Sequence, residues 1–175
     1  MNRPERHLAL CAASGLAALA LACSTVRVST DYDPSADFSR YRTFAFVPIK
    51  GVDEIAAGRI ETAISKALEA HGLQPATGGA DLRVRVHGRM SREKVITTVG
   101  GGWWHGWGGG MRTSTVQNVP VGTLIVGLVD TRDDKLVWRG TATDTITSTT
   151  GQGKQDELDG AMAKVFASYP PKPGQ

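Results

Sequence analysis

Residues 122–146, GTLIVGLVDTRDDKLVWRGTATDTI, decide the fold of this chain. The first nine are almost uniformly apolar, which is typical of a central strand with both faces covered. The run DTRDDK (130–135) is polar and short, as in a turn, and apolar and polar residues alternate again from Leu136 onward. The segment therefore predicts a β-hairpin near the middle of a sheet.

Further strands are predicted on the N-terminal side of this hairpin. Residues 81–90 (DLRVRVHGRM) alternate between apolar and charged side chains, which favours a strand with one face buried and one face in water. Residues 95–99 extend that strand, and residues 25–31 and 43–47 have the composition of two more. Most of these strands are joined by short turns, which favours antiparallel pairing.

Two helices complete the predicted domain. Residues 53–71 repeat apolar side chains at helical spacing, with Asp53 placed as an N-cap and Gly72 as the left-handed residue past the end. Residues 155–168 form the second apolar stripe. We therefore expect one α+β domain over residues 23–175: a two-layer sandwich of a mainly antiparallel sheet with both helices packed on one face.

The N-terminus predicts a signal peptide and a lipid anchor. Arg3 and Arg6 precede an apolar run at 8–22 that is shorter than the roughly 20 residues needed to span a bilayer, so residues 1–22 are expected to be a signal peptide. The run ends in ALAC (20–23), which resembles the lipobox of bacterial lipoproteins and predicts lipidation of Cys23. Ser24 in place of an aspartate favours the outer membrane, facing the periplasm. The alternative is an ordinary cleaved signal followed by an incidental thiol.

Composition excludes several classes of protein. The net charge of the 175 residues is +3, and +2 without the signal peptide, too small for a dedicated nucleic-acid binder. The sequence contains no phosphate-binding loop and no G-x-S-x-G motif, and its histidines are scattered. We therefore expect no catalytic residues, no metal site and no cofactor.

The segment GGGWWHGWGGG (100–110) is the most unusual feature of the chain. Its glycines specify no single backbone path, while three tryptophans in a loop make an apolar patch. Because both flanks have strand character, the segment is expected at the tip of a long hairpin. The tip could enter a membrane interface, stack on sugar rings or anchor a protein partner, or it could fold back over the sheet. The candidate residues are Trp103, Trp104, His105 and Trp107.

A second candidate surface is a basic row on the solvent face of the strand at 81–90. Arg83, Arg85 and Arg89, with His87 between them, share one face of this strand. Such a row could meet anionic lipid headgroups or acidic glycans. The alternative is an ordinary solvated strand face.

Several blocks together resemble a known family. They are DYD (31–33), ADFSRYRTFAF (36–46), ADL (80–82), the glycine- and tryptophan-rich middle, LVWRG (136–140) and a final helix that ends in YPP (169–171). In this order they resemble the bacterial lipoprotein family called domain of unknown function 4136. The resemblance implies an envelope lipoprotein with a small domain of helices and sheet, and it supplies no activity and no catalytic residues.

These observations lead to one main expectation and two alternatives. We expect an envelope lipoprotein that is a non-enzymatic binding module, held to the membrane through lipidated Cys23 and contacting another envelope protein or a glycan, with no nucleic-acid partner. One alternative is a structural or assembly role through strand edges. The other is an enzyme that acts on cell-wall or lipid substrates.

Overall fold

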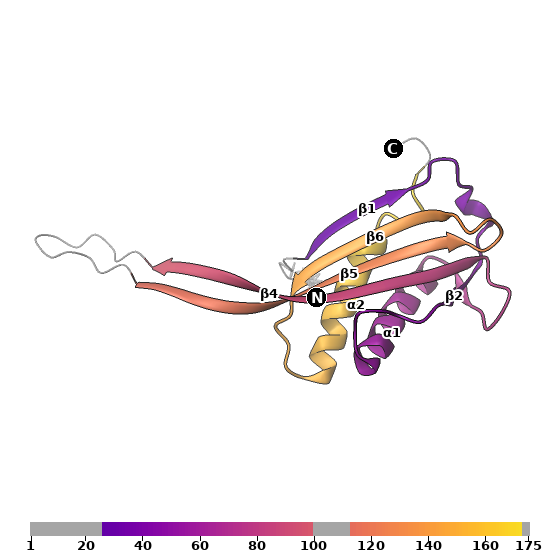
Figure 1. The fold of residues 1–175 in the computed structure, drawn as a ribbon. Helices are drawn as coiled ribbons and strands as arrows, with labels where there is room; N and C mark the ends of the chain where they lie inside the picture. The colour runs from indigo at the N-terminus through magenta and orange to yellow at the C-terminus, as the bar shows by residue number, and fades with distance from the viewer. Residues whose placement is uncertain (1–25, 100–112, 173–175) are drawn as a thin grey trace, which may run out of the picture.

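The computed structural model describes residues 26–99 and 113–172 (Figure 1). A six-stranded sheet forms one layer and two helices lie side by side across one of its faces, so the predicted two-layer α+β class is confirmed. The strands are β1 (Arg27–Tyr32), β2 (Thr43–Phe46), β3 (Gln74–Pro75), β4 (Leu82–Val99), β5 (Thr113–Asp130) and β6 (Leu136–Thr145), and the helices are α1 (Glu54–Ala70), α2 (Gly151–Phe166) and the short 3-10 turn η1 (Phe38–Arg40).

The sheet has the strand order β1-β6-β5-β4-β2-β3. The pairs β1–β6, β6–β5 and β5–β4 are antiparallel, as the sequence predicts, and the hairpin of residues 122–146 lies at the centre. The pairs β4–β2 and β2–β3 are parallel, which the sequence analysis did not predict. The reason is that α1 carries the chain from one end of the sheet to the other between β2 and β4, so β4 begins at the same end as β2.

The ends of α1 follow the predicted capping chemistry. Oδ1 of Asp53 accepts a hydrogen bond from the backbone N–H of Ala56 at 2.8 Å. At the other end Gly72 has a φ of +84°, and the N–H of Leu73 donates to the carbonyl of Leu68 at 3.2 Å. The second helix begins at Gly151 rather than near residue 155, because the side chain of Thr150 caps it by accepting from the N–H of Gly153.

The core lies between the helices and the adjoining face of the sheet. Trp138 of β6 is 1% exposed and stacks on Phe166 of α2 with ring centroids 4.8 Å apart. Gly140 makes room for this contact, because a Cβ at that position would come within 2.4 Å of Cγ1 of Val165. Regular alternation in β6 would place Leu136 in the core beside Trp138. The register shift between Leu128 and Val129 instead leaves Leu136 exposed.

Candidate functional site

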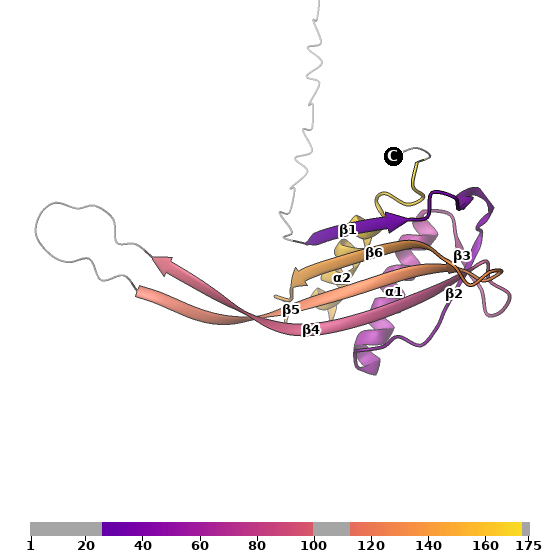
Figure 2. The ribbon, with the colours of Figure 1, turned by 45° about the horizontal axis from the view of Figure 1, so that its top comes forward.

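The most distinctive feature of the structure is a two-stranded arm. The strands β4 and β5 pair from Leu82↔Asp130 to Val99↔Thr113, but the flanking strands stop early. β6 accompanies β5 only as far as the pair Val121↔Thr145. On the other side, the chain beside β4 reaches only Lys50, which bridges to His87. We define the arm as residues 91–99 and 113–120, which extend about 30 Å beyond the six-stranded body (Figures 1 and 2).

The arm has little of its own to stabilise it. Residues 91–94 are exposed, and Val116 is 56% exposed although valine favours a covered strand face. A two-stranded hairpin is at best marginally stable in water, and both of its edges present unpaired N–H and C=O groups. Within the described residues neither helix and no third strand covers the arm.

The predicted tip, residues 100–110, lies outside the described residues. The two strands that flank it pair up to Val99↔Thr113, which confirms the predicted strand character of the flanks. The candidate residues Trp103, Trp104, His105 and Trp107 lie outside the described residues, as does Cys23. Their proposed roles therefore stay predictions.

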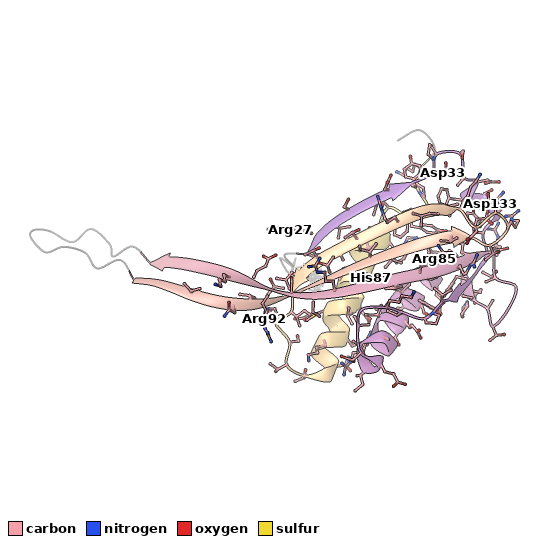
Figure 3. All side chains as sticks on the ribbon, in the orientation of Figure 1. Arg27, Asp33, Arg85, His87, Arg92 and Asp133 are labelled. Atoms are coloured by element: carbon pink, nitrogen blue, oxygen red, sulfur yellow. The ribbon has the colours of Figure 1, made fainter. Side chains whose placement is uncertain are left out.

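The predicted basic row lies on the open face of the sheet, opposite the helices. Two of its members are partly neutralised, because Arg83 and Arg85 donate to the same carboxylate oxygen of Asp134 at 2.8 and 2.9 Å. Asp134 reaches both from the β5–β6 turn, where its φ is +58°. Figure 3 shows Arg85 and His87 along β4 on this face.

The open face is most cationic near the arm. A cross-strand row there runs Arg27–Thr143–Thr123–Arg89, and the two threonine hydroxyls lie 3.2 Å apart. Within the described residues neither Arg27 nor Arg89 has an acidic partner, whereas Arg139 in the same sheet contacts Asp31 at 3.1 Å. The basic face therefore extends from β4 to β1, which the sequence could not show because it depends on the strand order.

A buried ionic cluster lies at the opposite end of the sheet. The side chain of Asp130 is fully buried and accepts hydrogen bonds from the Tyr41 hydroxyl at 3.0 Å, from the backbone N–H of Arg132 at 3.0 Å, and from Arg40. Burial by itself would raise the pKa of Asp130, but these hydrogen bonds outweigh it and hold the pKa below its usual value. The sequence analysis missed this cluster, because Asp130 stands where a polar turn begins.

The cluster is structural in character. Tyr41 is itself 3% exposed, and burial raises the pKa of its hydroxyl. Every partner of Asp130 comes from the segment around η1 or from the β5–β6 turn, so the carboxylate ties those loops to the end of β5. Nearby, Asp33 and Asp37 each accept from the backbone and hydroxyl of the serine two residues later, which is turn chemistry.

Residues 26–99 and 113–172 contain no helix that is long and apolar enough to cross a membrane.

The architecture defines a small class of domain, a helix-covered sheet from which one hairpin projects. The family model called domain of unknown function (DUF4136) matches residues 28–171, and the chain belongs to this family. No curated protein matches the chain in sequence.

Two solved structures are similar to the chain in fold. PelC from Paraburkholderia phytofirmans, solved as a dodecamer, is 17% identical, with a TM-score of 0.51 over 81% of this chain and 95% of PelC. A PDZ domain protein from Parabacteroides distasonis is 14% identical, with a TM-score of 0.54 over 85% of this chain. The match covers only 36% of that second protein.

Proposed function

We propose that the protein is a lipoprotein of the bacterial envelope, anchored through lipidated Cys23 in the outer membrane and facing the periplasm. In this proposal it is a non-enzymatic binding module whose arm contacts another envelope component, a protein or a glycan. The observation that carries the proposal is the arm itself, a hairpin that leaves the covered body. Beyond the hydrogen bond from the Ile146 N–H to the Pro120 carbonyl, its edges pair with no further strand among the described residues. Such edges gain backbone hydrogen bonds when a partner strand is added.

The proposed anchor is close in sequence to the start of β1. The described chain starts at residue 26 and β1 starts at Arg27, so three residues after Cys23 span at most about 11 Å. A lipid on Cys23 would therefore hold the body close to the membrane surface. The described arm extends roughly 30 Å beyond the body, far enough to meet a component that the body does not touch.

The proposal is tested by removing the arm while keeping the sheet. Replacing residues 92–120 by Asn-Gly joins the cross-strand partners Ser91 and Val121 by a two-residue turn that suits a hairpin. Affinity capture from envelope membranes should recover partners with the wild-type protein and lose them with this variant. A Trp103/Trp104/Trp107→Ala variant with the arm intact shows whether the tip carries the contact. Identical partners for all three proteins would contradict the proposal.

Anchoring is tested separately. Radiolabelled palmitate should be incorporated into the wild-type protein and should be absent from a Cys23→Ser variant. Incorporation that persists in the variant would contradict lipidation at Cys23, and it would leave the role of the arm open to the capture experiment.

A second candidate is assembly of several copies through strand edges. The observation in its favour is β1, an exposed edge strand whose outer side pairs with no strand in the part of the chain that the structure describes. PelC, which is similar in fold, was solved as a dodecamer. Sedimentation of the Cys23→Ser protein at high concentration tests this candidate. A strict monomer, with no cross-links between copies in cells, would contradict it.

A further inference from the structure

A cavity of about 720 Å³ lies at the root of the arm, between the sheet and the first halves of α1 and α2. Its volume is that of a small-molecule site, for which roughly 300–1,000 Å³ is usual. The floor is apolar: Leu124 and Ala142 come from the sheet, and Ile60, Leu158 and Ala161 come from the helices. The cavity is thus continuous with the hydrophobic core.

The mouth of the cavity is apolar as well. Ile55 of α1 and Met90 of β4 line it and are 69% and 57% exposed. They are the two most exposed large hydrophobic side chains on the described surface. Contiguous exposed apolar surface is a feature of ligand-binding grooves.

Three cationic residues also line the cavity without a carboxylate partner among the described residues: Arg59 of α1, Lys154 of α2 and Arg89 of β4. The three acidic side chains in the lining have hydrogen-bond donors of their own. Asp53 caps α1, Asp144 accepts from the N–H of Thr145 at 2.8 Å, and Glu157 accepts from the hydroxyl and N–H of Ser148 at 2.9 Å. The cationic groups are therefore the ones left to bind a ligand.

Two of these cations, Arg59 and Lys154, lie near the start of α2. A Cβ added to Gly151, the first residue of that helix, would lie 3.1 Å from Nη2 of Arg59, so the guanidinium reaches the helix N-terminus. Lys154 is in the first turn of the same helix. Because a helix N-terminus carries partial positive charge, cations are unfavourable there and an anion is favourable.

We propose that this cavity binds a long-chain amphiphile, one acyl chain with an anionic head group. The acyl chain lies on the apolar floor between the sheet and the helices, and the head lies between Arg59 and Lys154. Charge complementarity selects this ligand over a neutral lipid, and the apolar floor selects it over a free anion such as phosphate. The site lies in the body, so it does not depend on the proposed role of the arm.

Binding is measured on the full chain with Cys23→Ser, so that no acyl chain of the protein itself competes. The probe is cis-parinarate, a fluorescent fatty acid, displaced by palmitate or by palmitoyl lysophosphatidylglycerol. The stronger competitor of the two indicates whether the head is a carboxylate or a phosphate, and displacement by either supports the proposal. Absence of any binding would overturn it.

Matched variants locate the site. Ala56→Trp fills the cavity from α1 and should weaken parinarate binding about tenfold or more, whereas Ala163→Trp, exposed on α2 and away from the cavity, should not. Ile55 is exposed at the mouth of the cavity, so Ile55→Asp should also weaken parinarate binding, and it does so without changing the packing of the core. All variants share the N-terminal segment, so their differences report the cavity. Equal binding by Ala56→Trp, Ile55→Asp and Ala163→Trp would overturn the proposal.

The head-group contact has its own test. Arg59→Gln with Lys154→Gln should weaken palmitate about tenfold while leaving hexadecanol, the neutral chain of equal length, almost unchanged. A parallel loss of both ligands, or of neither, would overturn the assignment of the two cations.

Discussion

The body and the arm are built from the same two strands yet differ in what surrounds them. In the body, β4 and β5 have a strand on either side and two helices over one face, and the inward side chains of Leu82, Val84, Val126 and Leu128 are fully buried. In the arm, the same ladder continues with no flanking strand and no helix in the described part of the chain. Hydrophobic burial therefore explains the body but not the arm, for which we propose contact with a partner.

In the proposed function, stability and partner binding depend on different parts of one hairpin. The free energy of folding depends mainly on apolar area removed from water, and the body supplies almost all of it. Substitutions in the body should therefore change unfolding, and substitutions in the arm should change partner binding alone.

The largest effect is expected at Trp138. Replacing it by alanine removes a ring that is 1% exposed and stacked on Phe166, which should cost about 3–5 kcal/mol of unfolding free energy. Urea unfolding followed by circular dichroism measures the loss. A cost below about 1 kcal/mol would mean that the helices do not form one cooperative unit with the sheet.

A smaller effect, with a defined pH dependence, is expected at Asp130. Asp130→Asn removes the charge that Arg40 and Tyr41 contact and should cost about 1–3 kcal/mol at pH 7. Because folding lowers the pKa of Asp130, its contribution is present above the unfolded pKa of about 3.9 and is lost as the pH falls through the lower folded pKa. The stability difference between wild type and variant should thus shrink in acid.

Asp133→Asn is the matched control for that experiment. Asp133 lies on the exposed β5–β6 turn and its ion pair with Lys135 is 3.5 Å long, so its replacement should change stability by no more than about 0.5 kcal/mol. If both variants lose the same free energy of unfolding across the pH range, the buried cluster contributes no more to stability than the exposed ion pair does.

The sequence predicts the body well where its patterns are local. The central hairpin follows from an apolar run, a polar turn and renewed alternation, and α1 follows from its apolar stripe and caps, since Asp53 and Gly72 act as expected. The parallel placement of β2 beside β4 depends on how α1 crosses the sheet, and no local pattern encodes it. β3 is only two residues long and has no periodicity to detect.

The candidate surfaces are less predictable, because they depend on residues that are distant in sequence. The basic row on β4 could be seen in its alternation, but its extension to Arg27 requires knowing that β1 pairs with β6. The cavity is lined by both Arg59 and Lys154, which lie on different helices, so no local sequence pattern places them together. Alternation alone also could not show that Arg83 and Arg85 share Asp134.

Removing the arm should have a smaller effect on stability than either substitution in the body. Replacement of residues 92–120 by Asn-Gly keeps the pair Ser91↔Val121 and replaces Pro120, whose carbonyl accepts from the N–H of Ile146. The unfolding free energy should therefore change by less than about 1 kcal/mol, within the usual net value of one hydrogen bond. A large loss would show that the arm belongs to the cooperative unit of the body.

The smallest effect is expected from Val116→Ala, and the strand provides its own comparator. Val116 and Val126 are ten residues apart on β5, so period-two alternation places them on the same side of the ladder. Val126 is fully buried, and Val126→Ala should cost about 2 kcal/mol, whereas Val116 is 56% exposed and its replacement should cost less than about 0.5 kcal/mol. Urea unfolding of the two variants decides this. Equal costs would mean that the arm packs against another part of the chain, and the contrast between body and arm would then fail.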